Sequence, residues 1–247
     1  MRAIRRAVIA AMVMVVLSLG AWALARQPGA AKAESLVKTV TFRGARFDVV
    51  PLPLDRWDLR IGWTPGGTRL SEVQGAVRTN AGIFEPSFTP TGLLVSNGKE
   101  LHSLERAEGK GNFFLLPNGV FVMNAQGAAV METSEYTAAG VREATQSGPL
   151  LLRRGVLHPQ FNEASPNKLL RSGVGVRGNT VVLVISRDDV NLWTFAALFR
   201  DELKCSDALY LDGVISALWA ADSGRDADLG KGPFAGVITA FPRSEAR

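Results

Sequence analysis

The chain of 247 residues is 47% apolar and 21% charged, with a formal net charge of +5. Three of its arginines stand within the first six residues, so the remainder is nearly neutral, and we expect no nucleic-acid partner. The apolar fraction supplies a sizeable core, one large domain is favoured over two small ones, and the single cysteine, Cys205, excludes an intramolecular disulfide.

The first residues have the pattern of an export signal over residues 1–25. Basic residues at the N-terminus precede an apolar run, Ala7 to Leu24, which ends in a small-x-small cleavage pattern. Because about 20 apolar residues span a bilayer, a membrane anchor formed by residues 7–25 is the alternative. In both cases we expect the rest of the chain to be exported, to the periplasm or the cell exterior.

Residues 26–36 are polar and small and show no periodicity, which is typical of a linker, and a single domain is expected over residues 37–247. The domain opens with alternating apolar residues that predict two strands joined by a turn at Gly44, and Leu59 and Ile61 continue the pattern. Apolar spacing over residues 68–77 then predicts a short helix.

Four turn sequences between apolar runs predict hairpins. Asn97-Gly98 and Asn118-Gly119 carry the strongest short-range hairpin signal, and Arg154-Gly155 and Gly178-Asn179 add two more. The sheet must therefore be largely antiparallel.

Helices are expected to be few. Residues 191–204 carry apolar residues at helical spacing, with Asp188, Asp189 or Asn191 as N-cap, and residues 134–139 predict one or two turns. Cys205 would lie on the apolar face near the end of the first of these helices, which predicts a buried, unreactive thiol. The pattern as a whole predicts an α+β fold: a mixed, largely antiparallel twisted β-sheet with several hairpins, flanked by a few helices.

Common catalytic motifs are absent from the sequence. Gly173 to Gly178 fits G-x-G-x-x-G, but it lies inside a predicted strand and does not open a helix, so it is not a dinucleotide site. No G-x-S-x-G, P-loop, H-E-x-x-H or C-x-x-C occurs. We expect no cofactor and no zinc site, although scattered carboxylates could hold a hard cation through oxygen ligands.

Four polar segments beside glycine stand at probable strand ends, where the backbone can turn sharply and approach a ligand. An ordinary structural role competes at each position: Asn80 and Asp212 suit Asx-turns, and Arg171 suits a surface salt bridge. Four such segments in one chain nevertheless suggest one site. They are Thr79-Asn80-Ala81-Gly82-Ile83-Phe84-Glu85-Pro86, Gln146-Ser147-Gly148-Pro149, Arg171-Ser172-Gly173-Val174-Gly175 and Leu211-Asp212-Gly213.

Glu85 is a second candidate carboxylate. Phe84 and Phe88 flank it, and a partly apolar environment would raise its pKa into a range useful for proton transfer. A surface carboxylate before the loop proline Pro86 is the ordinary alternative. Sequence alone ranks neither Glu85 nor Asp212 first.

These segments, in this order, resemble the phosphodiester glycosidase family, which includes the lysosomal enzyme that uncovers mannose 6-phosphate and many bacterial exported proteins. The family's pattern of an asparagine, two small residues and an aromatic is matched by Asn80 to Phe84, and its Ser-Gly-Pro by Ser147 to Pro149. Arg171 matches its arginine before a glycine-containing strand, and Leu211-Asp212-Gly213 its Leu-Asp-Gly.

The resemblance runs from about Phe47 to Val237, and each matching segment is weak alone but specific in order and spacing. Val214 replaces the small residue that often follows Asp-Gly, and Ala81 stands where many members carry glycine. These departures leave the polar groups intact but narrow the expected site. The substrate of the animal enzyme is therefore not transferred.

The resemblance implies an exported hydrolase that cleaves a glycosyl-1-phosphodiester in an envelope or environmental glycan. The leaving phosphate is already a weak base, so its departure needs positive charge more than a strong general acid, and Arg171 would supply that charge. Either Asp212 or Glu85 would attack the anomeric carbon or activate water, and no cofactor is required. The expected ligands of sugar hydroxyls or phosphate oxygens are Asn80, Gln146, Ser147 and Ser216.

A non-catalytic exported module that holds an anionic glycan in the same pocket is the alternative. A pure binder would gain little from a carboxylate near phosphate, because like charges repel, so the two carboxylates beside an arginine favour catalysis. For either function, we expect one cleft to contain Asn80, Glu85, Ser147, Arg171 and Asp212.

Overall fold

The computed structural model of the protein describes residues 35–213, 215–223 and 231–244. The predicted export signal and nearly all of the predicted linker lie outside these residues. No helix in the described part of the chain is both long enough and apolar enough to cross a membrane. The predicted anchor over residues 7–25 is outside the part to which this finding applies.

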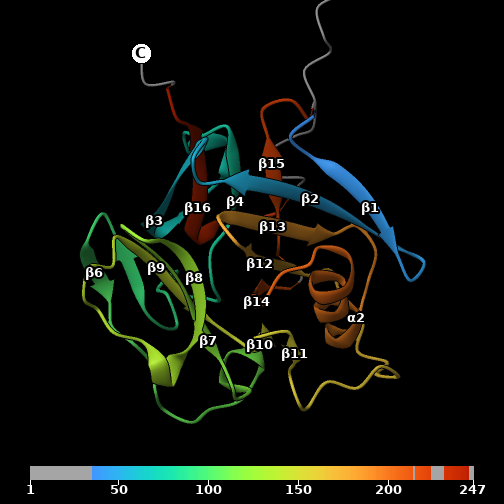
Figure 1. Ribbon diagram of the computed structural model, residues 1–247. Coiled ribbons are helices and arrows are strands. Elements are labelled where there is room, and N and C mark those ends of the chain that lie inside the picture. Colours follow the sequence, from blue (N-terminus) through green and yellow to red (C-terminus); the bar gives the residue numbers. More distant parts are fainter. Residues whose placement is uncertain (1–34, 214, 224–230, 245–247) are drawn as a thin grey trace, which may run out of the picture. The chain divides into compact units, whose positions relative to one another are not determined.

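Antiparallel strands dominate the described chain, and the largest of three sheets has seven of them (Figure 1). Its hairpins at Gly44, at Arg154-Gly155 and at Gly178-Asn179 confirm three sequence predictions. In strand order, this sheet contains β1 (Lys38–Phe42), β2 (Ala45–Pro53), β13 (Thr180–Ser186), β12 (Ser172–Arg177), β14 (Asp207–Asp212), β10 (Leu150–Arg153) and β11 (Val156–Leu157).

The other two sheets have four and five strands. The four-stranded sheet consists, in order, of β15 (Leu218–Ala220), β4 (Val77–Asn80), β16 (Phe234–Pro242) and β3 (Trp57–Thr68). The five-stranded sheet consists, in order, of β6 (Lys99–His102), β5 (Leu94–Ser96), β9 (Glu143–Ser147), β7 (Gly119–Asn124) and β8 (Gly127–Glu132).

One of the two Asn-Gly predictions is confirmed and the other is wrong. Asn97-Gly98 joins β5 to β6. Asn118-Gly119 joins no hairpin, because residues 112–114 form a 3-10 turn and Gly119 already opens β7, which turns at residues 125–126 into β8. Pro117, immediately before this pair, has no N–H to donate to a ladder, so the apolar run ahead of it does not continue as a strand.

Helical structure is scarcer than predicted. The expected helix over residues 191–204 forms as α2 (Leu192–Ala197) and a π-helical turn over Leu198–Glu202. Asn191 is its N-cap, and its side chain accepts a hydrogen bond of 2.8 Å from Thr194 N–H. The α+β prediction holds only broadly. Apart from α2 and its π-helical turn, the helical structure in the described residues consists of short 3-10 turns.

The helix predicted over residues 68–77 is wrong. β3 runs to Thr68, a single 3-10 turn covers Leu70–Glu72, and β4 begins at Val77. Gly75 adopts a φ of 140°, which no helix contains, so the chain turns back there although its apolar spacing is helical. The turns predicted over residues 134–139 are reduced to one 3-10 turn, Thr133–Glu135.

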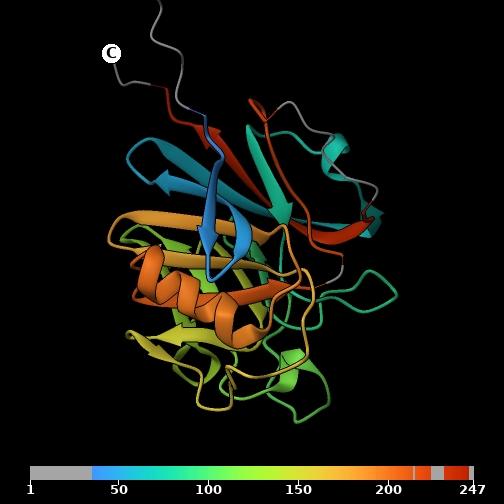
Figure 2. The same ribbon diagram turned by 90° about the vertical axis from the view of Figure 1, so that its right-hand side faces the viewer.

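Two apolar cores lie on the two faces of the seven-stranded sheet. One face packs against strands of the other two sheets, through residues such as Leu183, Ile61 and Phe121. The other face packs against α2 (Figures 1 and 2), and Phe195 of α2 and Phe199 of the π-helical turn belong to the core there. The sheet is therefore sandwiched, and its strand ends remain as the places where polar groups can gather.

Cys205 belongs to the core beneath α2. Its spacing predicted a place on the helix, but Cys205 lies just beyond the helical segment, which ends at Glu202. Its side chain is buried, and burial raises the pKa of the thiol to about 12. A thiol that is buried and fully protonated at neutral pH fits the predicted structural role.

Candidate active site

Three strands end, and a fourth begins, in one region. Asn80 is the last residue of β4, Ser147 of β9 and Asp212 of β14, while Ser172 is the first of β12. Because β12 and β14 are antiparallel neighbours, Ser172 is paired directly with Asp212. The topology thus joins residues that are as many as 132 positions apart in the chain.

A network of side-chain hydrogen bonds links these strand ends. The Ser172 hydroxyl accepts a bond of 2.9 Å from the Asn80 amide and one of 2.8 Å from the Ser216 hydroxyl, and it lies 3.4 Å from the Asp212 carbonyl. The Ser147 hydroxyl donates to the Leu211 carbonyl at 3.0 Å. Two serines from different sheets therefore hold consecutive carbonyls at the end of β14.

A β-bulge accounts for this arrangement. Ser172 pairs with Asp212 but Gly173 pairs with Tyr210, so Leu211 is an extra residue in β14. A bulge leaves backbone groups without ladder partners, and the serine hydroxyls supply hydrogen bonds there. The end of β14 is consequently fixed by side chains of neighbouring strands.

The carboxylate of Asp212 is partly buried. Its Oδ1 accepts a hydrogen bond of 2.6 Å from the Gly213 N–H, which is the only bond to this side chain among the described residues. Burial raises the pKa of the carboxyl from 3.8 to about 6, more than that hydrogen bond lowers it. A carboxyl with a pKa near 6 is suited to general acid–base work at neutral pH.

Arg171 is almost completely buried, with 1% of its surface exposed. It donates to the carbonyls of Val190 (2.7 Å) and Asn167 (3.1 Å), and its Nη1 lies 3.5 Å from the Tyr210 hydroxyl. No carboxylate in the described residues forms an ion pair with it, so the predicted alternative of a surface salt bridge is wrong. Burial lowers the pKa of the guanidinium, although the nearby charge of Asp189 acts to raise it. A buried guanidinium that no carboxylate of the described residues bonds directly is suited to bind an anion.

A small cavity borders this guanidinium. Its volume is about 120 Å³. Arg171 contributes a charged wall, and Phe161 and Trp193 contribute aromatic ones. The cavity therefore offers an anion a buried positive group.

Gln146 points away from this network. Its Oε1 accepts from the N–H groups of Leu93 (3.0 Å) and Glu105 (2.9 Å), and its Nε2 donates to the Glu105 carbonyl (2.7 Å) and the Thr133 hydroxyl (3.3 Å). These four bonds use the whole capacity of the amide. The predicted contact of Gln146 with substrate stays a prediction, and its bonds favour a role in holding the loop around Glu105.

Replacement of Gln146 by alanine should therefore destabilise the fold by about 2–4 kcal/mol, because buried backbone groups lose their partners. Urea unfolding would measure this. The matched control is Gln160→Ala, since Gln160 is exposed and makes one long bond of 3.4 Å; its effect should stay within about 0.5 kcal/mol. Equal stability of the two variants, with a raised KM for Gln146→Ala, would instead support direct substrate binding.

Glu85 lies on an exposed loop. Its carboxylate accepts a hydrogen bond of 2.8 Å from the Thr91 hydroxyl. The flanking rings of Phe84 and Phe88 stack on each other, with centroids 5.7 Å apart, and the carboxylate between them in sequence stays exposed. The competing role of Glu85 stays a prediction, and burial distinguishes Asp212 from it.

The structure adds two residues that the sequence patterns did not single out. Ser172 is at the centre of the strand-end network, and Tyr210 contacts Arg171 through its hydroxyl. Ser172 stands next to Arg171 in one of the four polar segments beside glycine, so the sequence did contain a signal for it. Tyr210 lies within the apolar run of a buried strand, where an aromatic residue is typical of a core.

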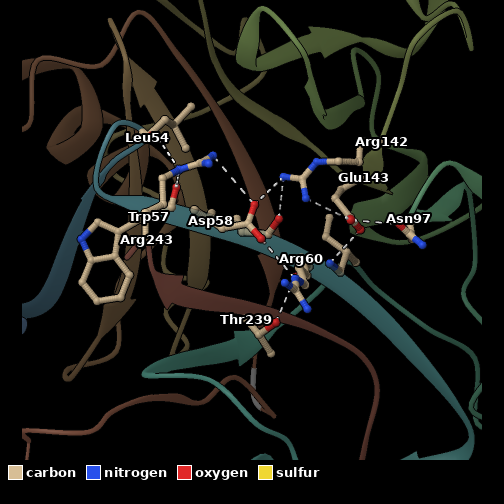
Figure 3. Close-up of polar contacts among 11 residues, drawn as sticks. Leu54, Trp57, Asp58, Arg60, Asn97, Arg142, Glu143, Thr239 and Arg243 are labelled. Carbon is tan, nitrogen blue, oxygen red and sulfur yellow. Dashed lines mark hydrogen bonds and ion pairs between the residues drawn. The ribbon is translucent and has the colours of Figure 1, made fainter. Parts of the chain in front are cut away.

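Figure 3 shows a second polar cluster. It contains Glu143, the first residue of β9, whereas Ser147 of the network is the last residue of that strand. The buried Glu143 accepts from the N–H groups of Ile61 (2.9 Å) and Asn97 (3.3 Å), while Arg142 pairs with Asp58 at 3.0 Å. Burial raises the pKa of Glu143. Protein groups satisfy these charges, and the cluster ties the four- and five-stranded sheets together. Within the described residues, no three His, Cys, Asp or Glu side chains are grouped as metal ligands.

Comparison with known sequences identifies a protein family. The sequence model of a family described as phosphodiester glycosidase matches residues 71–238. An uncharacterized protein of Escherichia coli strain K12, YigE, is 34% identical over 152 residues, which is 60% of this chain and 59% of that protein. The alignment thus spans less than two thirds of the relative.

Comparison with solved structures shows the fold. The catalytic domain of zebrafish N-acetylglucosamine-1-phosphodiester alpha-N-acetylglucosaminidase, auto-inhibited by its pro-peptide, is similar with a TM-score of 0.59 and 14% identity, over 86% of this chain and 85% of that one. A hypothetical protein from Synechocystis is similar with a TM-score of 0.56 and 16% identity, over 84% of this chain and 61% of that one. At such identities the likeness concerns the fold alone.

Proposed function

Because the chain belongs to the phosphodiester glycosidase family, we propose that it is an exported hydrolase that cleaves the bond between a sugar and the phosphate of a glycosyl-1-phosphodiester. The observation that carries this proposal concerns Tyr210: its hydroxyl lies 3.5 Å from the buried guanidinium of Arg171, and the charge of Asp212, a carboxyl with a raised pKa, also acts on that phenol. The guanidinium of Arg171 suits the phosphate, and the carboxylate of Asp212 suits the anomeric carbon or a water molecule. The substrate class proposed is an envelope or environmental glycan.

Arg171 stabilises the departing phosphate. When the bond between C1 and the phosphate oxygen breaks, its electron pair moves to the phosphate, and negative charge grows there. A guanidinium in a water-poor position interacts with that charge more strongly than an exposed one would. The carbonyls of Val190 and Asn167 fix its orientation before the substrate arrives, so little reorganisation is needed.

Asp212 acts on the sugar side, either as the nucleophile at C1 or as the base that activates water. Its raised pKa makes it more basic than an exposed carboxylate, while neutral pH still leaves it mainly ionised. Ser147 and Ser172 fix the backbone that carries it. Glu85 is the competing candidate and is less favoured, because it is exposed and bonded to Thr91.

Turnover of a panel of synthetic sugar-1-phosphodiesters by the purified protein tests the proposal. Release of free sugar and phosphate monoester from at least one member is the expected result. Tight binding of a diester without cleavage would favour the alternative, a binding module for anionic glycans. Absence of both binding and cleavage across a panel that varies the sugar and the anomer would overturn the proposal.

The pH dependence of kcat/KM should report Asp212. A carboxylate that attacks or activates water must be ionised, and its pKa in the folded protein is about 6. The value of kcat/KM should therefore fall about tenfold for each pH unit below 6 and level off above it. Measurements from pH 4.5 to 8 would show this limb, and a profile that falls with rising pH through 6 would make Asp212 a general acid instead.

A further inference from the structure

The Tyr210 hydroxyl is close to both groups that the proposed function uses. Its oxygen lies 3.5 Å from Nη1 of Arg171, and the ring of Tyr210 also lies 5.6 Å from the centre of that guanidinium. The Asp212 carboxylate, two residues further along β14, is close enough to contribute to a raised pKa of the phenol. Tyr210 therefore stands at the junction of the phosphate side and the sugar side.

The hydroxyl of Tyr210 has polar neighbours on two sides. Arg171 donates to its oxygen at 3.5 Å, and a side-chain interaction with Asn112 lowers the pKa of the phenol. Among the described residues, no carboxylate or backbone carbonyl accepts the hydroxyl proton. A phenol has one proton to donate, so Tyr210 places a donor in a buried position beside a cation.

Glycine at position 213 keeps space open beside this donor. A Cβ on Gly213 would lie 2.7 Å from the Tyr210 hydroxyl, which is closer than such contacts occur. Gly213 does not have a positive φ, so its conformation does not require glycine. The absence of a side chain at position 213 therefore leaves the Tyr210 hydroxyl free of a clash on the side of Asp212.

We propose that Tyr210 is a further catalytic residue, whose hydroxyl donates a hydrogen bond to a non-bridging oxygen of the substrate phosphate, beside Arg171. This inference rests on the proposed function. No proton is transferred from Tyr210: the bond to C1 breaks, its electron pair goes to the phosphate, and the phenol remains neutral. Burial keeps it so, because the pKa of Tyr210 is about 12.

The long separation of 3.5 Å between Tyr210 and Arg171 fits two donors that converge on one anion. Catalytic hydrogen bonds are often long in the absence of ligand and shorten when substrate binds. A phenylalanine at this position would fill the same apolar space beneath α2 without the cost of burying a hydroxyl. A buried hydroxyl beside a guanidinium is suited to donate to an anionic ligand that the guanidinium also binds.

The test compares the only two tyrosines of the chain. Tyr210→Phe removes the proposed donor, and Tyr136→Phe removes a hydroxyl that is buried and has no partner among the described residues. On a cleaved sugar-1-phosphodiester, Tyr210→Phe should lower kcat/KM about 10²-fold, as loss of one oxyanion donor does, and Tyr136→Phe should leave it unchanged. The inhibition constant for inorganic phosphate should rise about tenfold in Tyr210→Phe alone.

A third variant, Gly213→Ala, places a methyl group against the hydroxyl and should lose activity to a similar extent. Thermal unfolding of all three proteins separates this effect from misfolding, because the phosphate inhibition constant does not respond to a small change in stability. Equal kcat/KM and equal phosphate inhibition for the two Tyr→Phe variants would refute the role of Tyr210 while leaving the hydrolase intact. If the wild-type protein cleaves no diester, the proposed function fails, and this inference fails with it.

Discussion

Asp212→Asn is expected to abolish turnover while the protein stays folded and still binds its substrate. The amide keeps the shape of the side chain and the bond to the Gly213 N–H, but it is neither a nucleophile nor a base. We expect kcat to fall by about 10³-fold or more. Binding should be unchanged or tighter, because repulsion between the carboxylate and the phosphate is removed.

The same variant should be more stable than the wild type at neutral pH. The pKa of Asp212 is higher in the folded protein, about 6, than its ordinary value of 3.8, so folding favours the protonated form. Its contribution to stability is present below pH 3.8 and is lost as pH rises through 6. The cost at pH 7 is up to about 3 kcal/mol, and asparagine avoids it. A gain in stability with a loss of activity is typical of a functional residue.

Glu85→Gln is the matched control for Asp212→Asn. It also replaces a carboxylate by an amide, at the position of the competing candidate. Steady-state kinetics on one diester and calorimetric binding would be measured for both variants. Near-normal turnover is expected for Glu85→Gln, and the opposite outcome, an active Asp212→Asn with an inactive Glu85→Gln, would transfer the catalytic role to Glu85.

Arg171→Ala is expected to lower kcat/KM by about 10²–10³-fold, through both weaker binding and slower turnover. Arg171→Lys should restore little, because an ammonium group cannot reproduce the fork that reaches Val190, Asn167 and the Tyr210 hydroxyl together. Both variants also remove the hydrogen bonds from the guanidinium to the carbonyls of Val190 and Asn167. We therefore expect a loss of stability of about 1–3 kcal/mol, measured by urea unfolding.

The control variant Arg177→Ala separates the loss of activity from the loss of stability. Arg177 is at the other end of β12, is exposed, and donates to the Leu203 carbonyl at 3.1 Å, so it matches Arg171 in bonding to backbone but not in position. Its loss should leave kcat/KM unchanged. If Arg171→Ala loses no more activity than Arg177→Ala once both are measured well below their unfolding temperatures, Arg171 is only a structural arginine.

The sequence predicted the contacts of Asn80, Ser147 and Ser216 with the end of β14 better than it predicted the roles of these residues, and one cleft that also contains Glu85 and Arg171 stays a prediction. Glycine next to polar residues marked the strand ends that meet at Ser172, because sharp turns and close approaches need glycine. The direction of Gln146 was predictable in principle: adjacent strand residues point to opposite faces, so Gln146 and Ser147 cannot both face one site. Whether the amide capacity of Gln146 is filled depends on a loop some 40 residues away, and no local pattern contains that information.

The wrong predictions of secondary structure have similar causes. The helix predicted over residues 68–77 had the right apolar period, but tertiary pairing of β3 and β4 with β16 prevailed over it, and Gly75 permits the turn. The Asn118-Gly119 pair had the right turn chemistry, but Pro117 beside it removes the preceding strand. Hairpins such as β12–β13 were predictable because strand pattern and turn residues agreed there.

The bulge at Leu211 constrains how this site can evolve. Leu211 packs into the apolar core between the sheets, and Asp212 emerges at the rim only because one extra residue precedes it. Deletion of a single residue before Asp212 would draw the carboxylate inward to the position of a core leucine. Point substitutions can alter the chemistry of the strand end gradually, whereas a change in the length of β14 would bury its charge in one step. We therefore expect lineages of this fold to diversify through loops and side chains while the residue count between Asp207 and Asp212 stays fixed.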